Sequence, residues 1–211
     1  MTHPSPVAVA PATAVVSRVG TPVGPAEVWL ELPAGAPRAL LLLGHGAGGT
    51  VNSPDLAATT AATLAAGYAV ARVTQPYRVA GRKAPPRAPV LDEAWLAVAA
   101  ATTIPELPLV VGGRSSGARV ACRTATALGA AAVVTLAFPT APPRTPEKDR
   151  LAELAAPAVP VLVVQGAGDP FGIPPHAPGR TVVVLPGATH TIRGAAARAA
   201  GAAVVDWLEE L

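Results

Sequence analysis

Short apolar runs along the chain predict a series of strands covered on both faces. Residues 39–43, 68–73, 107–111, 131–137, 159–164 and 181–185 are almost continuous stretches of leucine, valine and alanine. Runs of this length without polar alternation are typical of parallel strands in the middle of a sheet, where both faces are buried. We therefore expect six central parallel strands.

Two stretches near the beginning have a different pattern. Residues 13–19 and 27–32 alternate apolar with polar side chains, as half-buried strands do, and the glycines and prolines of residues 20–25 predict a turn between them. We expect these strands to form an antiparallel edge of the sheet.

Helical segments are expected between the strands, at residues 54–67, 90–102, 116–128 and 191–211, with a short one near 146–156. Strands that alternate with helices indicate an α/β fold with a mostly parallel, doubly wound sheet. The length of 211 residues suits one domain over residues 13–211, preceded by a loose tail over residues 1–12 that is rich in proline and alanine. In such sheets ligands bind beyond the carboxyl ends of the strands.

Composition and charge argue against several classes of protein. The net charge is only +3, and no dense run of lysine and arginine with interleaved aromatics predicts nucleic-acid binding. No segment has the continuous apolar length of a membrane span or the layout of a signal peptide, so a cytoplasmic protein is expected. Cys122, the single cysteine, is expected in the core. No cluster of side chains has metal-ligand spacing, and no cofactor motif is found.

The strand at 107–111 runs into Gly113-Arg-Ser-Ser-Gly117, and an alanine-rich helical pattern follows. This is the G-x-S-x-G pattern of a sharp strand-to-helix turn that exposes a serine hydroxyl. Glycines flank Ser115 but not Ser116, which makes Ser115 the candidate nucleophile. Alone, the pattern fits an ordinary Gly-Ser turn equally well.

Two further candidates follow later strands. Asp169 lies in Gln165-Gly-Ala-Gly-Asp169-Pro, and His190 lies in Pro186-Gly-Ala-Thr-His190. A serine hydroxyl needs a neutral imidazole to take its proton, and the imidazole needs a carboxylate to hold its tautomer. A turn aspartate and a residue beside a helix start are simpler readings of each one alone. The order Ser115, Asp169, His190 and their three strand ends favour a catalytic triad.

An acyl-transfer site also needs backbone N–H groups that stabilise an oxyanion. The residue after the nucleophile, Ser116, is expected to supply one. The second is expected from the glycine-rich segment Gly44-His-Gly-Ala-Gly-Gly49, from Ala47 or, next, Gly46. This segment does not match the phosphate-binding glycine motifs.

Four other side chains are candidates for contact with a substrate. Arg78 and Arg82 lie in a proline-rich loop, residues 75–89, which carries several cations and no acidic residue. That loop is either a solvated surface segment or a holder of an anionic substrate group. His45 and Arg114 flank the predicted oxyanion and nucleophile positions, and His45 is expected to brace the oxyanion loop.

Together these motifs resemble the α/β-hydrolase superfamily, in particular small dienelactone-hydrolase-like proteins. Pro76-Tyr-Arg, Gly81-Arg-Lys-Ala-Pro and Glu93-Ala-Trp add a similarity to the testis-expressed and KANSL-type hydrolase-like branch. The resemblance covers residues 13–211. It implies cofactor-free hydrolysis of a small carboxylic ester or thioester through an acyl-enzyme, with Ser115, Asp169 and His190 as the triad.

Two further expectations follow from the resemblance. Many relatives insert a lid domain after the fourth central strand, whereas this chain has only residues 138–157 there, so we expect an open site without a lid. The superfamily also includes scaffold proteins. A non-catalytic binding protein on a retained hydrolase fold is therefore the alternative function.

Overall fold

A computed structural model describes residues 14–211. The predicted tail, residues 1–12, lies outside the described residues. The described strands join one eight-stranded sheet. The single domain over residues 13–211 stays a prediction.

The sheet has the order β1-β2-β4-β3-β5-β6-β7-β8. β1 and β2 pair antiparallel with each other, β2 pairs antiparallel with β4, and all later pairings are parallel. The predicted parallel sheet with an antiparallel N-terminal edge is confirmed. The strands are β1 (Val15–Val19), β2 (Ala26–Glu31), β3 (Leu40–Gly44), β4 (Ala69–Thr74), β5 (Leu109–Arg114), β6 (Ala132–Leu136), β7 (Val161–Gly166) and β8 (Arg180–Leu185).

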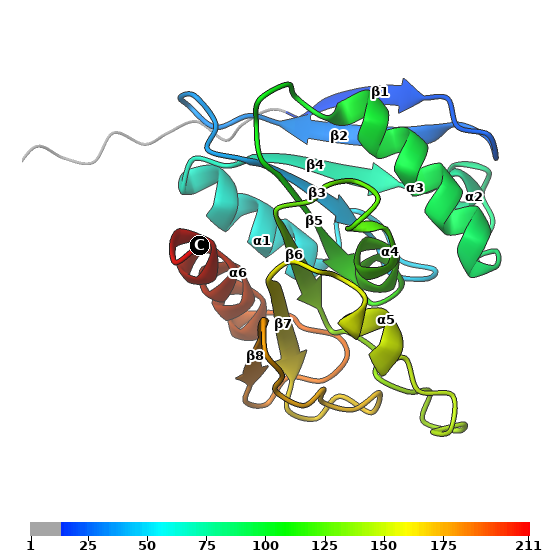
Figure 1. Ribbon diagram of the computed structural model, residues 1–211, viewed down its shortest axis with the longest axis vertical. Coiled ribbons are helices and arrows are strands. Elements are labelled where there is room, and N and C mark those ends of the chain that lie inside the picture. Colours follow the sequence, from blue (N-terminus) through cyan, green and yellow to red (C-terminus); the bar gives the residue numbers. More distant parts are fainter. Residues whose placement is uncertain (1–13) are drawn as a thin grey trace, which may run out of the picture.

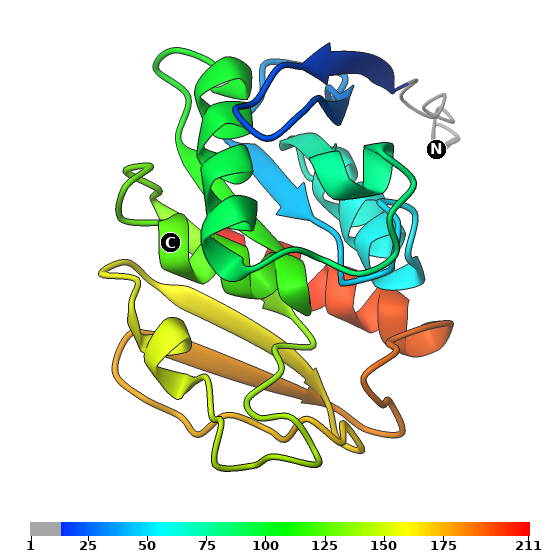
Figure 2. The same ribbon diagram turned by 90° about the vertical axis from the view of Figure 1, so that its right-hand side faces the viewer.

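Helices cover both faces of the sheet (Figure 1). α1 and α6 pack side by side on one face, and α3, α4 and α5 lie on the other (Figures 1 and 2). The helices are α1 (Pro54–Ala65), α2 (Pro76–Val79), α3 (Ala88–Thr102), α4 (Ser116–Thr124), α5 (Leu151–Ala155) and α6 (Ala195–Glu209).

The continuous apolar strands supply a core on each side of the sheet. Along β3, Leu41 and Leu43 face α1 and α6, while Leu40 and Leu42 face α3 and α4. Because successive side chains of a strand point to opposite faces, a strand buried on both sides must be apolar throughout. This explains why β3 to β7 were found from sequence as unbroken runs. β8 was expected to be covered on both faces as well, but it is the other edge of the sheet, and Thr181 and Val184 are exposed.

The ends of several elements differ from the prediction. β5 continues through two glycines to Arg114, because it pairs with β3 on one side and β6 on the other. α4 ends at Thr124 instead of residue 128. The loop 75–89 contains the one-turn helix α2, which begins at Pro76, a residue suited to the first turn of a helix.

The last helix begins four residues later than expected. Its N-cap is Gly194, with a φ of 60°, and the first helical residue is Ala195. Ile192 is fully buried between His190 and this cap, in the core against α6. His190 therefore lies in a loop of its own and not beside a helix start.

Candidate active site

Ser115 lies at a strained turn between β5 and α4. Its φ and ψ are 51° and −107°, a combination that non-glycine residues rarely adopt. The turn is possible because neighbouring glycines leave room. A Cβ on Gly117 would collide with the carbonyl oxygen of Gly44, and Gly113 has a φ of 156°. The geometry lifts the Ser115 side chain above the carboxyl end of the sheet.

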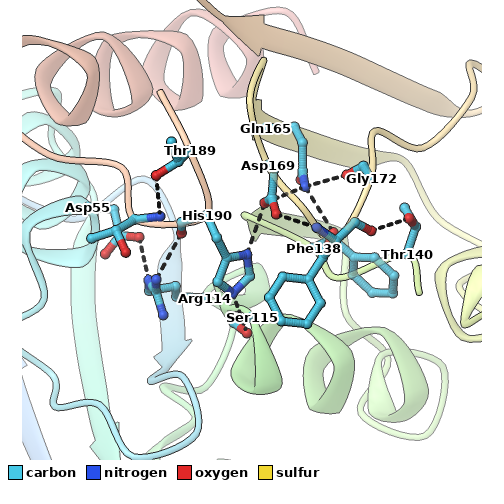
Figure 3. A network of polar contacts seen from close by, with 12 residues as sticks. Asp55, Arg114, Ser115, Phe138, Thr140, Gln165, Asp169, Gly172, Thr189 and His190 are labelled. Atoms are coloured by element: carbon cyan, nitrogen blue, oxygen red, sulfur yellow. Dashed lines mark hydrogen bonds and ion pairs between the residues drawn. The ribbon is translucent and has the colours of Figure 1, made fainter. Parts of the chain in front are cut away.

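The three side chains from separate loops form one chain of hydrogen bonds (Figure 3). His190 Nε2 lies 3.0 Å from Ser115 Oγ, and His190 Nδ1 lies 2.9 Å from Asp169 Oδ2. These partners select the tautomer in which Nδ1–H donates to the carboxylate and Nε2 accepts from the hydroxyl. The structure thus brings the predicted nucleophile, base and acid into hydrogen-bonding order.

Asp169 is held rigidly beneath His190. Its side chain is fully buried, Oδ1 accepts the N–H of Phe171 at 2.8 Å, and Oδ2 also accepts from Gln165 Nε2 at 2.8 Å. Gln165 Nε2 lies within hydrogen-bonding distance of the carbonyl oxygens of Phe138 and Gly172 as well. These contacts fix the carboxylate oxygen that faces the imidazole.

Sequence reasoning missed Gln165 and Phe171. The ring of Phe171 packs against the imidazole of His190, with centroids 4.4 Å apart. A fully buried glutamine at the end of an apolar strand was a usable signal, because a buried amide must find polar partners. Nothing in the sequence marked Phe171.

Two of the three predicted oxyanion donors, Ser116 and Gly46, lie beside Ser115, and Ala47 follows Gly46 in the chain. Ser116 is the first residue of α4, so its N–H belongs to the free first turn of a helix, whose dipole favours negative charge. Gly46 is buried, and a Cβ built on it would lie 3.5 Å from Ser115 Cβ, whereas Ala47 is exposed. Within residues 14–211, neither the Ser116 N–H nor the Ala47 N–H donates a hydrogen bond to the protein.

His45 braces the glycine-rich loop, which we define as residues 45–53. Its Nδ1 lies 2.8 Å from the carbonyl oxygen of Gly46, and its Nε2 accepts the N–H of Gln75 at 3.1 Å. Burial lowers the pKa of His45, the Arg78 cation lowers it further, and the hydrogen bond to Gly46 opposes them. Both nitrogens of this buried imidazole are bonded to backbone, which supports the expected bracing role; that role stays a prediction.

The predicted arginine contacts with a substrate are partly replaced by contacts within the protein. Arg78 donates from Nε to the carbonyl oxygen of Gly49 at 3.1 Å and from Nη1 to that of Arg82 at 3.1 Å. Arg82 itself is exposed. Arg114 donates to Asp55 and to the backbone of His190. Arg78 and Arg114 therefore hold the loops of the site together.

No metal site accompanies this arrangement in the part of the chain that the structure describes. Between Ala14 and Leu211, no three His, Cys, Asp or Glu side chains are grouped as ligands for a metal ion. No helix in the same residues is long and apolar enough to cross a membrane.

Comparison with known families agrees with the sheet order. The family model described as the alpha/beta hydrolase domain matches residues 37–183, which include β3 to β8 up to Val183. The chain belongs to the α/β-hydrolase family. No curated protein sequence matches it.

Solved structures of α/β-hydrolases share its fold. A serine hydrolase without a lid from Xanthomonas campestris has a TM-score of 0.72 and 20% identity, over 96% of this chain and 94% of that one. A dienelactone hydrolase from Anabaena variabilis has a TM-score of 0.73 and 19% identity, over 94% of this chain and 98% of that one. A serine hydrolase homologue from Coxiella burnetii has a TM-score of 0.71 and 19% identity, over 93% and 96%.

These likenesses confirm the α/β-hydrolase fold of the chain. Between β6 and β7 the structure has only loops and the short helix α5, which confirms the predicted absence of a lid domain. The narrower testis-expressed and KANSL-type branch stays a prediction.

Proposed function

We propose that this α/β-hydrolase cleaves a small carboxylic ester or thioester through an acyl-enzyme. The observation that carries the proposal is the chain of hydrogen bonds from Ser115 through His190 to Asp169. Beside it are two backbone N–H groups, of Ser116 and Ala47, that have no acceptor in the described residues. An esterase and a serine hydrolase homologue among the structural neighbours support the same reaction class.

Acylation begins with Ser115. Its Oγ attacks the carbonyl carbon of the substrate while His190 Nε2 takes the hydroxyl proton, and Asp169 stabilises the imidazolium that forms. The carbonyl oxygen becomes an oxyanion between the N–H of Ser116 and that of Ala47 or Gly46. Preorganised donors of this kind contribute about 3–4 kcal/mol each to transition-state stabilisation.

The tetrahedral intermediate then collapses. The bond to the alcohol or thiol breaks, and His190 gives its proton to that leaving group. Water next attacks the acyl-enzyme with His190 as the base, and the second collapse releases the carboxylic acid and restores Ser115. Every proton in this cycle passes through Nε2 of one imidazole.

The surroundings of the site are open. The glycine-rich loop presents the exposed Ala47, and between β6 and β7 the described chain has only loops and the short helix α5. The exposed cation Arg82 lies in the loop that packs against Gly48. In this contact the carbonyl oxygen of Lys83 is 3.6 Å from the position that a Cβ on Gly48 would take. A contribution of Arg82 to the binding of anionic esters stays part of the proposal. If Arg82 makes this contribution, Arg82→Ala loses the preference for anionic over neutral esters.

A fluorophosphonate probe tests the nucleophile. The native protein is expected to be labelled on Ser115, because the probe phosphorus reacts with an activated serine Oγ. Ser115→Ala is expected to lose labelling by at least about 100-fold, and ester hydrolysis with it.

Two controls sharpen this experiment. Ser17→Ala, which removes a hydroxyl from the distant strand β1, is expected to be labelled like the native protein. Fragmentation of the labelled peptide decides between the adjacent serines Ser115 and Ser116. Equal labelling of native protein and Ser115→Ala, or an adduct on Ser116, would contradict the proposed nucleophile.

A further inference from the structure

Arg114, the residue before the candidate nucleophile, links two loops that lie far apart in the sequence. Its Nε donates to Asp55 Oδ2 at 2.8 Å, and its Nη2 donates to the carbonyl oxygen of His190 at 2.8 Å (Figure 3). One planar guanidinium therefore spans the start of α1 and the loop that carries the candidate base.

Asp55 is an unusually firm anchor for this contact. Its side chain is 1% exposed, and its Oδ1 accepts the N–H of Leu56 at 2.9 Å. It also lies in the first turn of α1, where a negative charge is favoured by the helix dipole. A buried carboxylate needs a charged partner, and Arg114 is the cation that supplies it.

The loop is anchored on either side of His190 by the buried residues Ala188 and Ile192, but the backbone of His190 itself has few hydrogen bonds. Its carbonyl oxygen accepts no second hydrogen bond within residues 14–211, and the loop is bounded by Gly187 and Gly194, both with positive φ. The imidazole is tied to Asp169 and packs against the ring of Phe171, so these contacts hold the ring end of the residue. Arg114 fixes the backbone end of the same residue.

The guanidinium also borders the expected oxyanion loop. Its Nη1 lies 2.7 Å from the position that a Cβ on Gly46 would take. Arg114 thus lies between Ser115, whose backbone continues from its own, the glycine-rich loop and His190. A displacement of this side chain would reach three parts of the site together.

We propose that Arg114, held by Asp55, is a positioning residue that sets the His190 imidazole at hydrogen-bonding distance from Ser115. The inference rests on the proposed function, in which His190 is the base. It replaces the predicted contact of Arg114 with the substrate. Lysine would reproduce this role only in part, because an ammonium keeps the charge but lacks the planar fork that meets two acceptors in fixed directions.

Three variants test the positioning role. Arg114→Met removes the guanidinium and keeps the length of the stem, Asp55→Asn removes the anchoring charge, and Arg114→Lys keeps the charge without the fork. For Arg114→Met we expect kcat for a p-nitrophenyl ester and the rate of fluorophosphonate labelling to fall about 10- to 100-fold, with KM within about twofold of native. Asp55→Asn and Arg114→Lys are expected to fall in the same direction by less.

Arg123→Met is the matched control. Arg123, on α4, donates from Nε and Nη2 to the two oxygens of Asp92 at 2.8 and 2.6 Å, and it has no hydrogen bond to Asp55, His190 or the glycine-rich loop in the described residues. It is expected to lower stability and leave kcat unchanged. Backbone hydrogen exchange is expected to speed up over residues 187–193 in Arg114→Met and Asp55→Asn, and not in Arg123→Met.

The outcomes separate this inference from the proposed function. Absence of labelling in the native protein would contradict the proposed hydrolase function. The hydrogen-exchange experiment would still decide whether Arg114 holds the loop of residues 187–193. Native kcat with native exchange in Arg114→Met, or in Asp55→Asn and Arg114→Lys if Arg114→Met does not fold, would overturn the positioning role. A rise in KM without a change in kcat would overturn the positioning role and would show instead that Arg114 binds the substrate.

Discussion

Cys122 shows how burial decides the chemistry of a single side chain. It lies on the inner face of α4 at 1% exposure, seven residues after the candidate nucleophile. Burial, with a smaller effect of the Glu153 carboxylate, raises the pKa of the Cys122 thiol to about 12. Since the thiolate is the reactive form, this cysteine is a core residue, as predicted from its place in the helix.

We therefore expect Cys122 to resist thiol reagents in the native protein. With dithiobis(nitrobenzoate) near neutral pH, no thiol is expected to react until a denaturant unfolds the chain, when one equivalent reacts. The unfolded chain is its own control for reagent and stoichiometry. Reaction of the folded protein at the rate of free cysteine would show that α4 opens far more easily than its packing implies.

For single residues, the sequence predicted side chains whose roles follow from their position after a strand. It missed side chains whose roles depend on contacts with residues far away in the chain. Ser115, Asp169 and His190 were found because each follows a buried strand. The pairing of Asp55 with Arg114 joins residues 59 positions apart, and no local pattern encodes it. The triad roles remain a prediction until the labelling experiment is done.

Among the elements, the glycine-rich loop shows how a segment without secondary structure is held in place. His45 bonds to both Gly46 and the backbone of Gln75, Arg78 bonds to Gly49, and Arg72 donates to Val51 O at 3.1 Å. Contacts from β4 and from the loop after it thus fix the expected oxyanion donors. A loop this rich in glycine needs such contacts, because glycine loses the most conformational entropy on ordering.

The lowered pKa of His45 makes part of the stability depend on pH. The unfolded chain binds a proton at this histidine near pH 6.5, whereas the folded chain resists protonation until a lower pH. Its contribution is therefore complete above about pH 6.5 and is lost as the pH falls toward the folded value. We expect the free energy of unfolding to fall from about pH 7.5 to about pH 5.5 more steeply in the native protein than in His45→Asn, by urea titration. Equal slopes would show that His45 takes up its proton without cost.

Element types were predicted better than element ends. The apolar runs found the central strands, because burial on both faces leaves a continuous signal. They could not show that β5 continues to Arg114, since two glycines interrupt the run and only pairing with β3 and β6 extends it. The late start of α6 likewise depends on Ile192 entering the core.

Across the whole molecule, a buried ion pair joins the antiparallel edge to the parallel sheet. Glu31 at the end of β2 pairs with Arg72 of β4, and both side chains are 9% exposed. Arg72 also donates to Asn52 Oδ1 at 2.7 Å, so the pair connects the edge strands to the glycine-rich loop. Removing one partner leaves the other charge buried without compensation.

Glu31→Gln is expected to reduce the free energy of unfolding by about 3 kcal/mol, measured by urea denaturation. The matched control is Glu209→Gln, which breaks the Arg38–Glu209 pair, whose side chains are about half exposed. That change is expected to cost less than about 1 kcal/mol, because water screens an exposed pair. Similar losses in the two variants would mean that solvent reaches Arg72 in the folded protein.

The dihedral angles of Ser115 bear on whether this protein is a catalyst or a scaffold. A serine backbone held at a φ of 51° and a ψ of −107° costs the fold about 1–3 kcal/mol. A protein that serves only as a scaffold for partners gains nothing from this conformational strain, and a glycine at this position would relieve it. The backbone strain at Ser115 is therefore itself an argument that its hydroxyl takes part in a reaction.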